Sequence, residues 1–183
     1  GVFYNTGGAS LAALRGMAIS NSATVNGGAV YNAAGGMLTL HNTYLVSSTA
    51  GVDGGGLYNR SANLDARHDT LYANTAGDQG GGIYHNASST TPVINSMLIV
   101  ENSAASGGGI YSASADPDFD YNDVYANTGG NYGGLLTAGD GIRNISVDPM
   151  FASTEFGTDT FLRLAGNSPV EDEGDLNSPV TVD

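Results

Sequence analysis

The sequence predicts an all-β fold, a parallel β-helix of about six coils, because two short motifs recur in constant phase every 26–27 residues. The first motif is a run of small residues followed by an apolar residue and a tyrosine, and the tyrosines fall at positions 4, 31, 58, 84 and 111. The second is a polar pair ahead of the next glycine run: Asn21-Ser22, Ser48-Thr49, Asn74-Thr75, Asn102-Ser103 and Asn127-Thr128. A period of this size is typical of solenoids, in which each repeat buries its apolar face against its neighbours.

Strands are expected where residues alternate or are β-branched between turn residues, as at 37–40, 93–99 and 119–121. Helices are not expected, because Gly, Asn, Ser and Thr interrupt every window long enough to form one. Such a coil accommodates three short strands and three turns, and stacked coils place equivalent residues about 4.8 Å apart. We expect the coils to span residues 1–147, to wind right-handedly as parallel crossovers do, and to end in a closing segment of the same domain at 148–183.

Composition limits the partners of the chain. The 183 residues include no cysteine and five basic residues, all arginine, and the net charge is −13. Nucleic acid and anionic membrane surfaces are excluded as partners, because both need Lys or Arg to neutralise phosphate. No membrane insertion is expected, because no apolar run reaches the roughly 18 residues of a membrane span. The acids gather late in the chain: residues 1–100 hold four against three arginines, and residues 101–183 hold fourteen against two.

The tyrosine of each repeat is expected to point away from the core. The residue before it is bulky and apolar in every repeat, and side chains alternate in direction along a strand. An exposed or groove-lining stack is therefore predicted from Tyr4, Tyr31, Tyr58, Tyr84 and Tyr111. Two roles stay open for this stack: a structural cover of the strand face, or a ligand-binding stripe for sugar rings, since tyrosine offers both an apolar face and a hydroxyl.

A polar residue follows each tyrosine. Asn5, Asn32 and Asn59 occupy this position in the first three repeats, and His85 and Ser112 follow in the next two. Amide side chains at the same turn of successive coils can hydrogen-bond to one another. We therefore predict a structural ladder of the three asparagines, which His85 interrupts.

The acidic stretch after residue 115 is the candidate metal site. Asp116, Asp118 and Asp120 are two residues apart, so on a strand they share one face and repel one another unless a cation lies between them. A calcium site is one interpretation and a solvated acidic strand face is the other. No catalytic residue is assigned, because the chain has no lysine and the nearest arginine, Arg143, lies about a coil away. No cofactor other than Ca²⁺ is expected.

The C-terminal third resembles a known family in its motifs. Asp148-Pro149-Met150-Phe151 and then Ser168-Pro169-Val170-Glu171-Asp172-Glu173-Gly174-Asp175 are similar, in this order, to the closing segment of bacterial right-handed parallel β-helix repeat proteins, in which varied anchor signals follow. Words such as Gly28-Ala29-Val30 are similar to the repeats of chlamydial polymorphic outer-membrane proteins. Glu171 and Glu173 depart from the family, which has an apolar and a small residue there, so we expect the tail not to pack as a core strand. The resemblance implies a secreted or cell-surface protein and transfers no catalytic residue.

Three functions are weighed on these grounds. The first is a non-catalytic extracellular module with a structural or adhesive role. Because the sequence begins inside a repeat motif, its first coil would leave unpaired edges, and copies could associate head to tail into fibres. The second is a polysaccharide lyase or glycoside hydrolase of the pectin-lyase-like kind, which requires a groove with carboxylates, a bound cation and an arginine. The third is a glycan-binding module that uses the tyrosine stripe.

Overall fold

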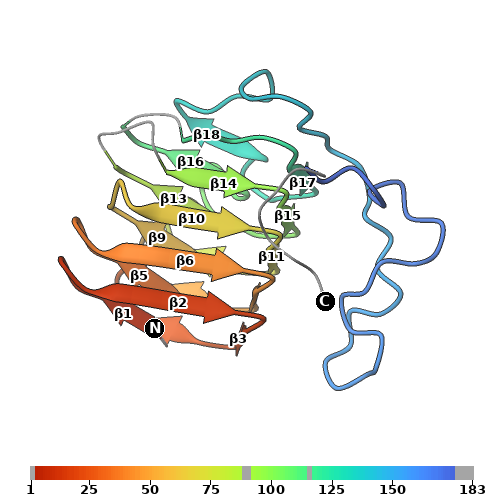
Figure 1. Cartoon of the computed structure of the whole chain (residues 1–183), viewed down its shortest axis with the longest axis horizontal. Coiled ribbons are helices and arrows are strands. Elements are labelled where there is room, and N and C mark those ends of the chain that lie inside the picture. The colour runs from red at the N-terminus through yellow and green to blue at the C-terminus, as the bar shows by residue number, and fades with distance from the viewer. Residues whose placement is uncertain (1–2, 88–91, 115–116, 176–183) are drawn as a thin grey trace.

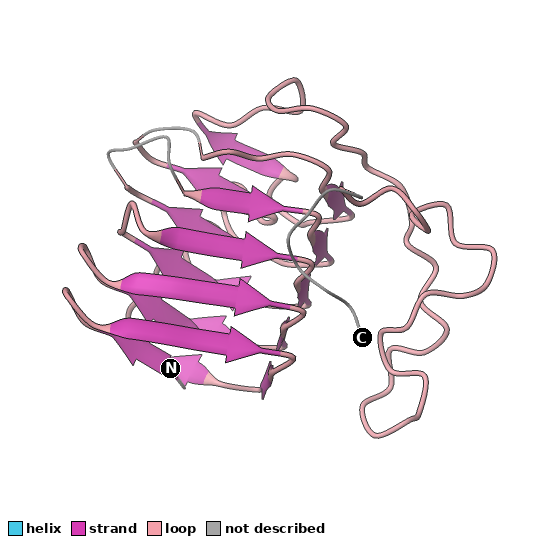
Figure 2. Cartoon of the chain, in the orientation of Figure 1, coloured by secondary structure: helices cyan, strands magenta, loops and turns pink. Residues whose placement is uncertain are grey.

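The computed structural model describes residues 3–87, 92–114 and 117–175 and winds them into a solenoid of short parallel strands (Figure 1). No helix occurs in these ranges (Figure 2). The predicted all-β parallel β-helix is confirmed. About four turns are formed rather than the six expected, because the later coils keep strands on only part of their circumference.

The first three coils pass through four sheets in the same order. The strands of the first three sheets within the described ranges are as follows. Sheet A holds β1 (Phe3–Asn5), β5 (Val30–Asn32), β9 (Leu57–Asn59), β13 (Ile83–His85), β16 (Ile110–Ser112) and β18 (Tyr132–Gly134). Sheet B holds β2 (Ser10–Leu14), β6 (Met37–His41), β10 (Leu64–Arg67) and β14 (Val93–Asn95). Sheet C holds β3 (Met17–Ile19), β7 (Tyr44–Val46), β11 (Thr70–Tyr72), β15 (Leu98–Val100) and β17 (Asp123–Tyr125).

The fourth sheet, sheet D, is a short corner made in the described ranges by β4 (Ser22–Ala23), β8 (Thr49–Ala50) and β12 (Thr75–Ala76). All pairs between these strands are parallel, and their register follows the sequence repeat, as in the pairing of Tyr31 with Tyr58. Equivalent residues of successive coils therefore lie directly above one another, as the constant phase of the two motifs predicted.

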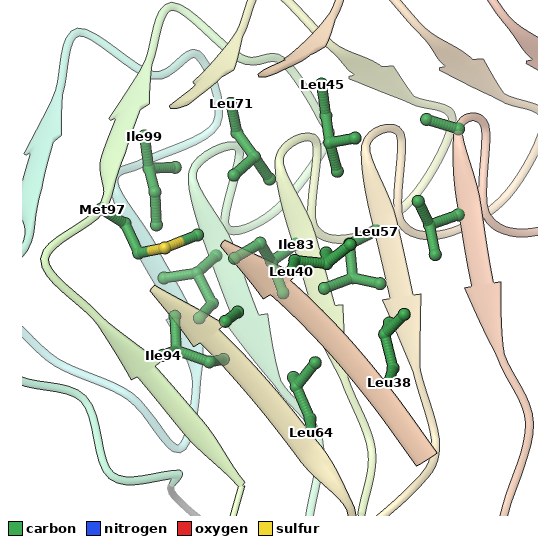
Figure 3. Packing of buried hydrophobic residues seen from close by; sticks show 14 of the residues in the cluster. Leu38, Leu40, Leu45, Leu57, Leu64, Leu71, Ile83, Ile94, Met97 and Ile99 are labelled. Atoms are coloured by element: carbon green, nitrogen blue, oxygen red, sulfur yellow. The ribbon is translucent and has the colours of Figure 1, made fainter. Parts of the chain in front are cut away.

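The core consists of columns of apolar side chains that point into the solenoid from sheets A, B and C (Figure 3). In the four inner repeats the residue before the tyrosine is fully buried, as predicted. These residues are Val30, Leu57, Ile83 and Ile110. Leu38 and Leu40 enter from sheet B, and the column of Leu45, Leu71 and Ile99 enters from sheet C. Alternation along each strand separates these residues from the outward-facing ones, which places the candidate sites on the outer surface or at the corners.

The corners between sheets use a single residue in the left-handed conformation. Between sheets B and C these residues are Arg15, Asn42, His68, Ser96, Tyr121 and Arg143, with φ between 53° and 57°. A second column between sheets C and D consists of Ser20, Ser47, Ala73, Glu101 and Ala126, with φ between 49° and 55°. Residues with a Cβ pay a steric cost there, so the corners need compensation from elsewhere.

The segment from 148 to 175 lies outside the solenoid, along sheet C (Figure 1). Phe151 packs edge-on against the ring of Tyr72, with 5.8 Å between the ring centroids. The amide of Asp175 donates to Ser96 Oγ over 3.0 Å. Within 148–175 the chain forms only isolated bridges, such as the antiparallel one between Phe151 and Leu164. This segment therefore packs against the side of the rod.

Candidate functional site

The five repeat tyrosines form one continuous stack of rings. Successive ring centroids from Tyr4 to Tyr84 are 4.9 Å apart, the step from Tyr84 to Tyr111 is 5.8 Å, and the planes are within 11° of parallel. The stack lies on the outer face of sheet A. We expected it to be exposed or to line a groove, but Tyr58 and Tyr84 are only 7% and 8% exposed, because neighbouring rings cover both of their faces. Tyr4, at one end, is 68% exposed.

Burial changes the acidity of the inner hydroxyls. Burial raises the pKa of Tyr58 to about 12, and the adjacent hydroxyls of Tyr84 and Tyr31 add to the shift. The guanidinium of Arg60 lies close to the hydroxyls of Tyr31 and Tyr58. The ring faces are thus occupied by other rings, and the polar features left to a partner are the hydroxyl edge and Arg60.

The stack ends where the last coil departs from the repeat. Gly133 pairs with Tyr111 and takes the place of the next tyrosine. A Cβ on Gly133 would lie 2.8 Å from Tyr111 Cδ2, so the glycine backbone packs directly against the ring. The glycine covers the final ring face with backbone, and no side chain larger than hydrogen fits there.

The asparagines after the tyrosines form a chain of buried hydrogen bonds. Asn5 Nδ2 donates to Asn32 Oδ1 over 2.9 Å, and Asn32 Nδ2 donates to Asn59 Oδ1 over 2.8 Å. We expected His85 to interrupt this ladder, but its Nδ1 lies 3.1 Å from Asn59 Nδ2 and must accept from it. His85 is fully buried, and burial lowers its pKa to about 4, so the ring is neutral and extends the ladder by one coil.

A second asparagine ladder runs along the corner between sheets C and D. Asn74 Nδ2 donates to Asn102 Oδ1 over 2.9 Å, and the chain of amides continues through Asn127 to Asn131 over 3.0 Å at each step. Asn74, Asn102 and Asn127 belong to the second sequence motif. In the sequence that motif marks only the phase of the repeat, and its role in a ladder was missed, although its spacing is close to that of the first ladder.

A third ladder, between sheets B and C, contains a carboxyl group. Asn122 Nδ2 donates to the Ile94 carbonyl over 2.9 Å and to Asn144 Oδ1 over 3.1 Å. Asp69 occupies the equivalent corner two coils earlier, and its Oδ1 accepts from the Thr43 amide over 2.7 Å. Burial raises the pKa of Asp69 well above its ordinary value, with the Thr43 amide opposing the shift. The ionised form of this carboxyl group is therefore disfavoured in the folded protein.

The candidate calcium ligands lie partly outside the described residues. Asp116 is outside them, Asp118 is exposed, and Asp120 is half-buried with its Oδ1 accepting from the Ile142 amide over 2.6 Å. Burial raises the pKa of Asp118, and the neighbouring Asp120 carboxylate adds to this effect. Within the described ranges, no three His, Asp or Glu side chains converge well enough to hold a metal ion. The calcium site stays a prediction that depends on Asp116.

Comparisons with protein-family models, with curated proteins and with solved structures gave no match. In the part of the chain that the structure describes, no helix has the length and apolar character needed to cross a membrane. The functional argument therefore rests on the geometry of the stack, the ladders and the outer surface.

Proposed function

We propose that this chain is a non-catalytic structural module, a rigid rod in a secreted or cell-surface bacterial protein of the β-helix repeat type. The observation that carries the proposal is that the recurring polar and aromatic residues contact their own equivalents one coil away. Tyr58 stacks between Tyr31 and Tyr84, and Asn32 bonds to Asn5 and Asn59. The repeat motifs therefore maintain the stacking of the coils, and adhesion or spacing is the role that suits a rod of this kind.

Self-association head to tail is part of this proposal. The strands β1, β2 and β3 each have one edge without a partner strand in the described structure. The first coil also exposes large apolar side chains at Tyr4, Leu14 and Met17. A second copy could add its last coil in register to this edge. The acidic C-terminal end of that copy would then meet the N-terminal half of the first copy, which is close to neutral. Sedimentation velocity at increasing concentration tests this part, and a monomer at every concentration would remove it.

Glycan binding is the second candidate, favoured by one observation. The hydroxyl edge of the tyrosine stack and Arg60 together offer hydrogen-bond donors along the rod. An array of glycans probed with the wild type and with Arg60→Ala tests this candidate. Binding that Arg60→Ala weakens supports it, and an array without signal rules it out.

A lyase or hydrolase would overturn the proposal of a non-catalytic rod. The carboxylates of Asp118 and Asp120 and the guanidinium of Arg67 lie on the outer side of the coil that carries sheet B. Incubation with polygalacturonate and with alginate, each with and without calcium, tests for this activity. Release of reducing ends or of unsaturated product would refute the non-catalytic role.

A further inference from the structure

A cavity of about 210 Å³ lies between the outer face of sheet C and the C-terminal segment. Leu98 lines it from sheet C, and Leu164 and Val170 line it from the C-terminal segment. The acidic and basic residues of the lining are Asp69, Asp123, Arg143 and Glu173. The volume exceeds the roughly 150 Å³ of an apolar cavity that holds benzene, and it is smaller than the ~300 Å³ at which pockets for drug-sized ligands begin.

Buried polar atoms in the wall of this cavity lack partners. Asp123 is 2% exposed, and its Oδ1 accepts from the Val147 amide over 3.0 Å. Its Oδ2 is buried and has no hydrogen-bond partner among the residues that the structure describes. His68 also lines the cavity, and its buried Nε2 likewise has no hydrogen-bond partner among the described residues. Such groups are rare in native proteins, because an unpaired buried polar atom costs free energy, and the carboxylate oxygen Asp123 Oδ2 indicates a missing donor.

The charge of the site selects the kind of donor. Burial raises the pKa of Asp123 to about 6, an effect to which Asp148 adds and which the Val147 amide opposes, so the carboxylate is ionised above that pH. Burial lowers the pKa of His68, which is therefore neutral. Arg143 lies over the ring of Tyr121, with 5.8 Å from the guanidinium carbon to the ring centroid. The lining holds three acids, Asp69, Asp123 and Glu173, against the single guanidinium of Arg143.

We propose that this cavity binds a small organic cation, with a primary ammonium group at Asp123 Oδ2 and a short aliphatic body against Leu98, Leu164 and Val170. An ammonium group supplies both the missing hydrogen-bond donor and the opposite charge that a buried carboxylate requires. The apolar half of the wall favours an aliphatic body over a hydrated metal ion. Since both the coils and the C-terminal segment form the wall, an occupied site ties this segment to the rod.

Methyl NMR of the whole 183-residue chain tests the proposal, with n-butylammonium chloride, n-butanol and sodium butyrate as probes of matched size. Butylammonium is expected to shift the methyl signals of Leu98, Leu164 and Val170 saturably, and butyrate is expected not to. The Asp123→Asn variant should bind butylammonium about tenfold more weakly, or worse, because it loses the charge-assisted hydrogen bond. Asp78→Asn, which removes one exposed acid elsewhere, should bind as the wild type does.

A second variant keeps the test decisive if Asp123→Asn does not fold. Leu164→Trp fills the cavity from the C-terminal segment and should abolish the shifts of Leu98 and Val170. The proposal is overturned if butylammonium gives no saturable shift, if butanol binds as tightly, or if either variant retains the wild-type affinity.

Discussion

Replacing Asp69 by asparagine should stabilise the solenoid at neutral pH. The carboxyl group is fully buried, and burial raises its pKa well above the ordinary 3.8, so the ionised form is disfavoured in the folded protein. An asparagine carries no charge at any pH. Asn122 donates to the carbonyl of Ile94. The strand register places the carbonyl of Leu40 at the equivalent position two coils earlier. The amide of an asparagine at 69 should donate there.

The expected magnitude has two parts. A carboxyl with a raised pKa stabilises the folded state fully below its unfolded pKa, and this contribution is lost as pH rises through the folded pKa. Over that window the loss is about 1.4 kcal/mol per pH unit. The new hydrogen bond of the amide contributes about 1 kcal/mol more. At pH 7 the free energy of unfolding of Asp69→Asn should therefore exceed that of the wild type by at least about 2 kcal/mol.

Urea unfolding followed by circular dichroism between pH 4 and pH 8 measures this difference. Other groups titrate in this range, so the relevant quantity is the difference between the variant and the wild type at each pH. That difference should grow with pH for Asp69→Asn and stay flat for the exposed control Asp78→Asn. The reasoning is refuted if Asp69→Asn is less stable than the wild type at pH 7, or if the difference does not change with pH.

Three further substitutions probe the stack, the first ladder and the corners by the same unfolding measurement. Tyr58→Ala should lower the free energy of unfolding by about 3 kcal/mol, because Tyr58 stacks on both faces. Tyr4→Ala, at the exposed end, should lower it by under about 1 kcal/mol. Equal losses would contradict the stack. The pKa of the buried His85 lies near 4, so the wild type should lose about 1.4 kcal/mol of stability per pH unit as pH falls from 6.5 towards 4. His85→Asn should remove this loss. The same loss of stability at acid pH in the variant would contradict a neutral buried ring. Gly55→Ala should lower the free energy of unfolding by about 3 kcal/mol or more, because the new Cβ would meet the Gly81 carbonyl. Gly166→Ala should be nearly neutral, because the space around Gly166 is open. Similar effects at both glycines would contradict close stacking of the coils.

The sequence predicted the parts of this molecule that repeat. The period determines which residues lie above one another. The stack of tyrosines and the hydrogen bonds among Asn5, Asn32 and Asn59 therefore follow from spacing alone. The burial of Tyr58 does not follow, because it depends on rings packed only 4.9 Å apart. The predicted number of coils was wrong because the repeat motifs count coils without showing which strands each coil keeps.

The cavity could not be predicted from the repeat. One of its walls is the segment after residue 148, which has no equivalent elsewhere in the chain to reveal its register. Contacts such as the one between Asp175 and Ser96 join residues 79 positions apart with no periodic signal. The acids of that region appeared in the sequence only as net charge, and the isolation of Asp123 Oδ2 is a property of packing.

The ladders explain how the solenoid tolerates its strained corners. Tyr121 adopts a left-handed conformation and is followed by Asn122, and the pairs Ala73-Asn74 and Glu101-Asn102 repeat the arrangement. The amide that follows each corner residue donates to a ladder oxygen of the next coil over about 2.9 Å. Each strained residue costs roughly 1–2 kcal/mol, and a buried amide that forms two or three hydrogen bonds contributes about 1 kcal/mol for each. Corner and ladder thus act as one unit, which is why a carboxyl group at Asp69 is the place where this rod should be easiest to improve.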